Sequence, residues 1–157
     1  MARRLALIGA LVGLVGLLLA ATIPFASAAR TKTLRFTSPE SQEVFHFSET
    51  GKKGPSLGDG LVGHGPLHRT GGAVGGHFYV TCTFVRLKPF RAQCLGTIYI
   101  AGQGQATFQG VFSPRQGNQP PFNLAITGGT SAYQGVGGQV TISTVNKVDH
   151  FTVHLIM

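Results

Sequence analysis

The feature that most constrains the fold is a two-residue alternation of apolar and polar side chains, which recurs along the chain after residue 28. Side chains of a β-strand point alternately to its two faces, so this alternation is typical of a strand with one buried face. No stretch after residue 28 repeats its apolar residues with the 3.6-residue period of a helix. Most of the 23 glycines also lie there, and glycine favours turns over helices. The sequence therefore predicts an all-β domain.

About eight short strands are predicted. They are expected at 43–47, 61–67, 78–84, 94–100, 105–112, 122–126, 140–144 and 151–155. Clusters of glycine, proline and polar residues, such as 51–55 and 113–118, provide the turns between them. Because each strand is apolar on one face only, the strands are expected to form either a sandwich or a closed barrel. Residues 29–42 are predicted to be an N-terminal tail or a partial strand.

The first 28 residues have the three parts of a secretory signal peptide. Arg3 and Arg4 precede an uncharged apolar run at 5–25, and Ala26-Ser27-Ala28 then offers small residues to a signal peptidase. We expect cleavage after Ala28 and a secreted, extracellular protein. The alternative is an N-terminal membrane anchor, because the apolar run is long enough to cross a bilayer. The domain faces outward in either case.

The chain has two cysteines, Cys82 and Cys94, and they are predicted to form a disulfide. Both are equally distant from Lys88, which lies in a predicted turn, so a hairpin centred there places them opposite each other. An exported protein meets an oxidising environment, in which such a pair becomes cross-linked. Closing so short a loop contributes about 3 kcal/mol or somewhat less to stability.

The charge distribution and the histidines exclude two kinds of site. Lys and Arg outnumber Asp and Glu by 13 to 5, but they are scattered, whereas nucleic-acid-binding proteins gather basic residues on one face. His64 and His68 are four residues apart, and this spacing along a strand is ~13 Å, too long for one metal ion. We therefore expect no nucleic-acid partner, no metal and no cofactor.

Glu43 is the candidate catalytic residue. It shares alternate positions with Phe45 and Phe47, so its carboxyl is predicted to project into the interior, where burial would raise its pKa and suit it to acid–base chemistry. The alternative is a strand-end residue at the mouth of the barrel. The apolar residues expected to line a ligand cavity are Phe45, Phe47, Phe78, Val80, Phe84, Ile98, Ile100 and Phe108.

The most distinctive motif lies in the glycine-rich stretch 124–140. It resembles the Gly-Gly-Ser/Thr-x-x-aromatic-x-Gly signature of the allene oxide cyclase and dirigent-type β-barrels. The matching residues are Gly128, Gly129, Thr130, Tyr133 and Gly135. Gly58-Asp59 resembles the Gly-Asp element of the same family, and the likeness covers 43–157. The resemblance implies an eight-stranded antiparallel β-barrel with an apolar cavity.

The resemblance also implies a function. The barrel is expected to hold a small hydrophobic molecule and to act as an isomerase or cyclase, or as a dirigent-type protein that sets stereochemistry. A separate oxidase or an upstream biosynthetic enzyme would supply the reactive substrate. The plant cyclases use a Glu-x-Asn on the first strand and a Ser-Pro pair after it. Here the predicted first strand, 43–47, lacks Glu-x-Asn, and Ser38-Pro39 precedes it.

The alternative is a non-catalytic extracellular binding or cell-envelope protein that uses the barrel as a scaffold. A wide apolar cavity with one or two inward polar groups would favour the first function. A barrel packed solid with phenylalanine and isoleucine would favour the second. The oligomeric state is left open, and a homo-oligomer is among the expected partners.

Overall fold

The computed structural model describes residues 29–157 except Lys52 and Gln116. The predicted signal peptide, 1–28, lies outside the described residues. None of the helical structure in the described part has the length and apolar character of a membrane-crossing segment. The all-β fold class is confirmed, because the only helical element in this part of the chain is a three-residue 3-10 helix, η1 (Glu40–Gln42).

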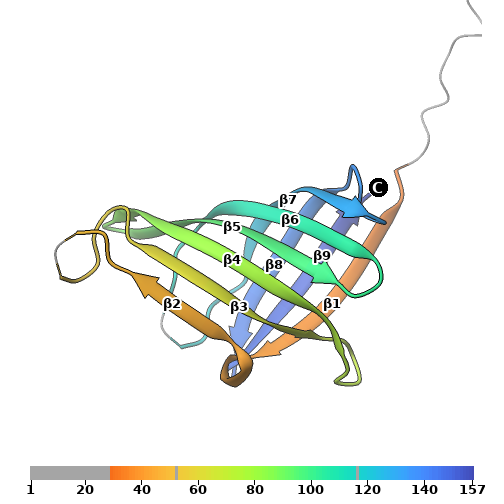
Figure 1. Ribbon diagram of the computed structural model, residues 1–157, viewed down its shortest axis with the longest axis horizontal. Coiled ribbons are helices and arrows are strands. Elements are labelled where there is room, and N and C mark those ends of the chain that lie inside the picture. The colour runs from red at the N-terminus through yellow and green to blue at the C-terminus, as the bar shows by residue number, and fades with distance from the viewer. Residues whose placement is uncertain (1–28, 52, 116) are drawn as a thin grey trace, which may run out of the picture.

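Nine strands form one sheet in the order β1-β9-β8-β7-β6-β5-β4-β3-β2, and a further pairing between β1 and β3 closes it. The bounds are β1 Thr31–Pro39, β2 Val44–Ser48, β3 Gly60–His68, β4 Val74–Leu87, β5 Phe90–Ile100, β6 Gly104–Phe112, β7 Phe122–Ser131, β8 Gly137–Val145 and β9 Val148–Ile156. All pairs are antiparallel, and β1 with β3–β9 make the predicted eight-stranded barrel (Figure 1).

The N-terminal segment corrects the prediction of a tail or partial strand. β1 pairs with β9 through all nine of its residues, from Thr31 opposite Ile156 to Pro39 opposite Val148. β2, which was predicted to be the first barrel strand, instead pairs with β3 alone and is exposed along its whole length. Leu34 and Phe36 are the only large apolar residues on the inner face of β1, so its alternation is weak in sequence. The Ser38–Pro39 pair therefore ends the first strand and does not precede it.

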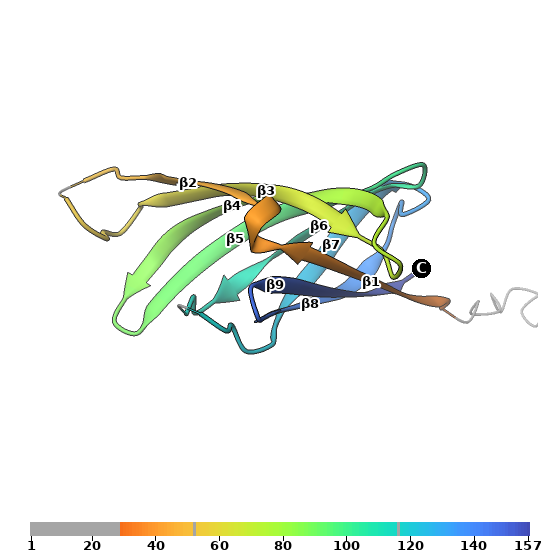
Figure 2. The ribbon, with the colours of Figure 1, turned by 90° about the horizontal axis from the view of Figure 1, so that it is seen from below.

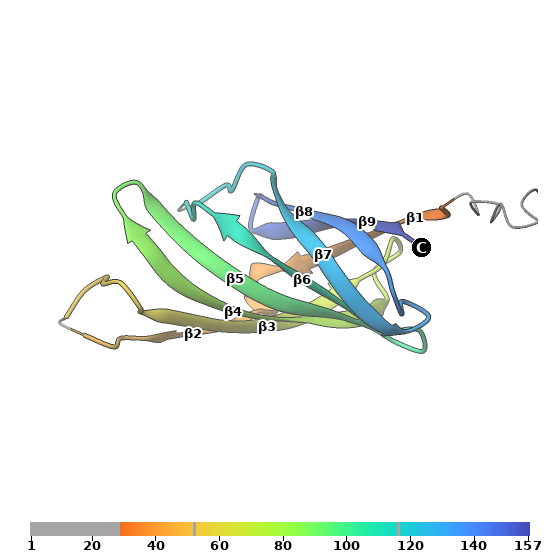
Figure 3. The ribbon, with the colours of Figure 1, turned by 90° about the horizontal axis from the view of Figure 1, so that it is seen from above.

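The barrel has two distinct ends. The tyrosine end carries the turns at 69–73, 101–103 and 132–136, and Tyr133 lies there. The glutamate end carries η1, Glu43, the long loops 49–59 and 113–121, and the turns at 88–89 and 146–147. At the glutamate end the long β4–β5 hairpin and β2 diverge from β8 and β9 (Figures 2 and 3).

The middle of the barrel is filled by apolar side chains from every part of the wall. Phe78, Ile98, Ile100, Phe108 and Phe151 are all at most 3% exposed and belong to one buried cluster. A smaller cluster around Cys82, Cys94 and Phe84 continues toward the glutamate end, and Val80 contacts both clusters.

The predicted disulfide is confirmed. Cys82 lies opposite Cys94 in the β4–β5 pair, and the two Cα atoms are 4.0 Å apart. The turn is shorter than predicted, because Lys88 and Pro89 alone join the strands. A bulge at Val85 shifts the register by one residue between the turn and the disulfide.

Candidate functional site

Glu43 lies where the chain turns back from β1 to β2. η1 makes this turn, and it is held at both sides. The Glu40 amide donates to the Lys147 carbonyl at 3.0 Å, and Gln42 lies in hydrogen-bond contact with the His68 ring at 2.8 Å. The Glu43 amide in turn donates to the Glu40 carbonyl at 3.2 Å. These contacts fix the direction in which the Glu43 side chain leaves the backbone.

The Glu43 side chain enters the barrel through space left by a glycine. Gly65 lies on the inward face of β3, and a Cβ placed on it would be 2.9 Å from Glu43 Cγ and 2.8 Å from Phe78 Cε1. It would also be 3.1 Å from Ser38 Oγ, so the three side chains meet over Gly65. β1, β3 and β4 thus contribute one residue each to the surroundings of the carboxyl.

Two polar atoms at this point lack hydrogen bonds within the described part of the chain. They are Oε1 of Glu43 and Oγ of Ser38, and both are fully buried. Ser38 as a whole is 0% exposed. An unsatisfied buried polar group costs about 1–3 kcal/mol, so such groups are rare and often belong to functional sites.

Burial of the carboxyl raises the pKa of Glu43 to about 7, as expected from the sequence. The Ser38 hydroxyl, which lies near the carboxyl without completing a hydrogen bond to it, opposes this effect, and the nearby charges of Asp149 and Glu40 add to it. Desolvation acts this way because it penalises the charged form of a carboxyl. A carboxyl with this pKa can both donate and accept a proton at neutral pH.

Asp149 extends the acidic surroundings. It lies opposite Ser38 in the β1–β9 pair, and its Oδ1 accepts a hydrogen bond of 2.6 Å from the Thr144 hydroxyl. Burial raises the pKa of Asp149 as well, against the effect of Thr144. No group of three His, Cys, Asp or Glu suited to holding a metal ion occurs in residues 29–157, Lys52 and Gln116 apart.

Aromatic rings make the other side of the site apolar. The ring of Phe78 lies 5.3 Å from that of Phe151 and 6.4 Å from that of Phe45. Further along β2, the ring of Phe47 lies 5.5 Å from that of Phe84. The site therefore combines one ionisable group with a wall of phenyl rings.

The predicted cavity residues divide into two groups. Phe78, Phe84, Ile98, Ile100 and Phe108 are buried inside the barrel, and Val80 is partly buried. Phe45 and Phe47 are 45% and 48% exposed, because β2 lies outside the barrel and their rings cover the rim at the glutamate end. Phe45 occupies the space over Gly63, where a larger residue would collide with its ring.

Asp59 organises the loop 49–59. Its carboxylate accepts hydrogen bonds from the amides of Thr50 and Ser56, at 2.9 and 2.7 Å, and from both of their hydroxyls. The Thr50 amide and the two Ser56 groups together lower the pKa of Asp59 to about 2. Gly58 precedes it with a φ of 89°, a conformation that favours glycine.

The glycine-rich motif closes the tyrosine end. Tyr133 is 1% exposed, and its hydroxyl donates a 2.6 Å hydrogen bond to the Gln103 side chain. Lys32 Nζ donates to the same oxygen at 3.1 Å. Gly129 is required here because a Cβ would lie 2.5 Å from the Gln105 carbonyl oxygen and 2.6 Å from that of Tyr133. The motif, including Gly128, Thr130 and Gly135, therefore has a structural role.

Sequence reasoning missed Ser38, Gly65 and Asp149. Asp149 follows a turn, and Gly65 is one of many glycines, so neither carries a local signal. Ser38 was noted only as part of a Ser-Pro pair, and its inward direction depends on β1 being a complete strand.

Comparison with known proteins places the fold. No protein-family profile matches the chain, and no curated protein matches it in sequence. A structure of pyocyanin demethylase superposes with a TM-score of 0.64 at 24% identity, covering 80% of this chain and 99% of that chain. A pterocarpan synthase dirigent protein gives 0.64 at 13% identity, with 82% and 90% covered. An exo-specific intermolecular Diels-Alderase gives 0.63 at 8% identity, with 83% and 100% covered. The chain has the barrel fold that these proteins share.

Proposed function

We propose that this protein is a secreted barrel that binds a small hydrophobic molecule at its glutamate end and acts on it as a cyclase, an isomerase or a dirigent-type protein. The observation that carries the proposal is the half-buried Glu43 carboxyl. One of its oxygens is buried without a partner in the described residues, and its pKa is about 7 beside Phe45 and Phe78. The shared fold with dirigent and Diels-Alderase barrels supports the same class of function.

In this proposal the phenyl rings orient the ligand and Glu43 moves a proton. Orientation in a shaped apolar site removes much of the entropic barrier of a cyclisation or coupling. The protonated carboxyl donates to a leaving or carbonyl oxygen, and the carboxylate accepts a proton from carbon or oxygen. A separate oxidase or an upstream enzyme would supply a reactive substrate. The most specific form of the proposal is the allene oxide cyclase reaction itself. This chain would have to carry it out without the Glu-x-Asn that the plant enzymes use.

Binding is tested with a neutral fluorescent probe, N-phenyl-1-naphthylamine. Its fluorescence should rise with the wild type, and binding should weaken as pH rises through 7, because ionised Glu43 disfavours an apolar neighbour. Glu43→Gln should bind without most of this pH dependence, while Glu40→Gln should keep it. Asp149 and Glu40 are the other acids that face Glu43. No fluorescence increase, or an unchanged pH dependence in Glu43→Gln, would contradict the proposal.

Catalysis is tested on the molecule retained by the natively purified protein. Native mass spectrometry identifies that ligand, and turnover of its precursor is then followed. Glu43→Gln should lower the rate by about 100-fold or more if Glu43 is the acid–base group. Equal rates in Glu43→Gln and wild type would remove that role.

A non-catalytic scaffold is the second candidate function. The observation in its favour is the packed middle of the barrel, where Ile98 is 0% exposed and Phe108 is 1% exposed. If no ligand is retained and the probe does not bind, this candidate replaces the first.

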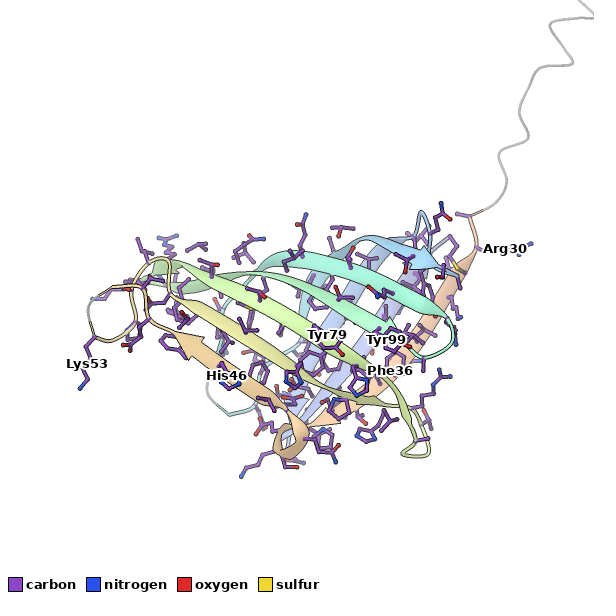
Figure 4. All side chains as sticks on the ribbon, viewed as in Figure 1. Arg30, Phe36, His46, Lys53, Tyr79 and Tyr99 are labelled. Atoms are coloured by element: carbon purple, nitrogen blue, oxygen red, sulfur yellow. A yellow bond between two sulfur atoms is a disulfide. The ribbon has the colours of Figure 1, made fainter. Side chains whose placement is uncertain are left out.

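We also propose that the outer wall of β3–β6 forms contacts between copies of this chain. Tyr79 and Leu95 are 50% and 58% exposed there, and Tyr99 lies on the neighbouring strand to Tyr79 (Figure 4). The residues that line the two hollows on this wall carry no formal charge, although the chain as a whole carries +8. Like-charged copies would meet most easily at such a surface. Light scattering should show an oligomer in the wild type and a monomer in Leu95→Lys. A monomeric wild type would contradict this contact.

A further inference from the structure

The barrel wall is incomplete on one side of β1. β1 pairs with β9 over nine residues, but with β3 only where Thr37 lies opposite His68. From Thr31 to Phe36, no strand among the described residues therefore lies beside the β1 edge on the β3 side, and the β3–β4 turn at 69–73 lies there instead. We call this interval, lined by Thr31–Phe36 and 69–73, the seam.

Two pockets adjoin the seam. One, of about 340 Å³, is lined by Thr33, Leu34, Arg35, Phe36, Arg69, Thr70, Ile100 and Gln103. The other, of about 400 Å³, also has Arg35, Phe36, Arg69 and Thr70 in its lining, and adds His68, His150 and the Gly71–Gly72 turn. Neither lining contains an aspartate or a glutamate. Arg35 and Arg69 thus line both pockets, and neither pocket contains a carboxylate.

The position of Arg69 depends on the local backbone. Its side chain lies across Gly75, where any Cβ would collide with it. Its positive charge reaches the Tyr133 hydroxyl: burial raises the pKa of Tyr133, and Arg69 opposes that rise. Arg69 therefore lies near Tyr133 and lines both pockets.

The remaining lining suits a ligand with two different parts. Guanidinium groups bind carboxylates and phosphates through paired hydrogen bonds, and the Thr33 and Thr70 hydroxyls and the Gln103 amide provide further donors. Leu34 and Phe36 offer apolar surface in the same pocket lining, from the inward face of β1, whereas Arg35 lies between them in sequence on the exposed face. An oxyanion and an apolar chain can both be accommodated.

We propose that the seam binds an amphipathic anion, a carboxylate or phosphate monoester whose oxyanion lies between Arg35 and Arg69 and whose apolar body lies against Leu34 and Phe36. The seam and the Glu43 site are neighbours, because His68, which lines the second pocket, contacts Gln42. The two proposals rest on different groups, the arginines here and the carboxyl there, so variants of Arg35 and Arg69 and of Glu43 test them separately.

The test is calorimetric titration with decanoate, decyl phosphate, decanol and inorganic phosphate. Decanoate or decyl phosphate should bind at least about tenfold more tightly than decanol, and Arg35→Gln/Arg69→Gln should remove this preference. Tight binding of inorganic phosphate alone would show that the apolar body is not recognised and would overturn the amphipathic part. Equal binding of decanol would overturn the anion part.

A matched control removes the same charge elsewhere. Arg86→Gln/Arg115→Gln lies at the glutamate end and should bind like the wild type; an equal loss there would mean that only net charge matters. Glu43→Gln should keep the preference for the anions over decanol, since no carboxylate lines either pocket. Amide shifts in a nitrogen-15 spectrum should move at 31–37 and 69–73 on titration, and shifts confined to other segments would contradict this location.

Discussion

The two ends of the barrel differ in whether their buried polar groups have hydrogen-bond partners. At the tyrosine end the Tyr133 hydroxyl and the Lys32 ammonium both donate to Gln103, and the whole tyrosine is buried. At the glutamate end Glu43 and Ser38 each bury a polar atom without a hydrogen-bond partner in the part of the chain that the structure describes. The ends also differ in shape, since Lys53 extends on a long loop at one and Arg30 lies beside the barrel wall at the other (Figure 4).

The difference separates stability from function. A satisfied polar network holds neighbouring strands in one arrangement. The motif around Tyr133 does this with Gly129, which no other residue could replace without collision. An unsatisfied pair lowers stability and persists where binding or chemistry requires it. The most recognisable sequence motif therefore marks the structural end, and the candidate chemistry lies at the opposite end.

The largest effect is expected from truncation at the tyrosine end. Tyr133→Ala should lower the free energy of unfolding by about 3–5 kcal/mol, because it empties a fully buried aromatic position. Tyr133→Phe should cost only about 1 kcal/mol, since it removes the hydroxyl alone. Urea denaturation measures both, with the half-exposed Tyr79→Ala as control. A Tyr133→Ala cost as small as that of Tyr79→Ala would mean that this end is not the stabilising one.

The Cys82–Cys94 disulfide stabilises the region near the glutamate end by a covalent bond, as Tyr133 stabilises the tyrosine end by packing and a hydrogen bond. Cys82→Ala/Cys94→Ala should lower stability by about 3 kcal/mol or somewhat less, because the unfolded chain loses a closed loop. The reduced wild type should unfold at the same urea concentration as the double variant. A free-thiol assay on the denatured, unreduced protein should find no thiol, and a full thiol titre would exclude the cross-link.

A smaller effect is expected from filling the space beside Glu43. Gly65→Ala should cost about 1–3 kcal/mol and displace the Glu43 side chain, because the new methyl would overlap its position. The pKa of Glu43, followed by carbon-13 NMR of its carboxyl, should then fall from about 7 toward the ordinary value. Gly137→Ala is the control, since nothing lies within 4 Å of a Cβ there. An unmoved pKa in Gly65→Ala would show that Glu43 does not depend on this space.

The smallest effects are in the pH dependence of stability, in two separate windows. Glu43 has a raised pKa, so the stability that it contributes is complete below its unfolded value near 4.5 and is lost as pH rises through about 7. Asp59 has a lowered pKa, so its contribution is complete above about 3.8 and is lost as pH falls through about 2. Denaturation midpoints of Glu43→Gln and Asp59→Asn should each lack one of these slopes. A slope that survives in its own variant would assign it to another group.

The sequence predicted what local patterns determine. Cys82 and Cys94 were placed opposite each other by their equal distance from Lys88, and the raised pKa of Glu43 followed from its apolar neighbours. β1 was missed because only Leu34 and Phe36 mark its inner face. β2 was wrongly predicted to be a barrel strand because Phe45 and Phe47 alternate clearly with polar residues, although their rings cover the rim of the barrel at the glutamate end. The contact between Ser38 and Glu43 depends on which strands close the barrel, and no spacing in the sequence contains that information.

The single β1–β3 pairing has a consequence for how this barrel can be entered. A barrel in which every pair of neighbouring strands is fully hydrogen-bonded admits a ligand only through its two ends, and its diameter is set by the number of strands. In the described residues, β1 and β3 pair only at Thr37 and His68, so the wall has its fewest strand pairings along this line. Separating β1 from β3 there would break one strand pairing and leave the β1–β9 and β3–β4 ladders intact. We therefore expect the barrel to open along this line before any other.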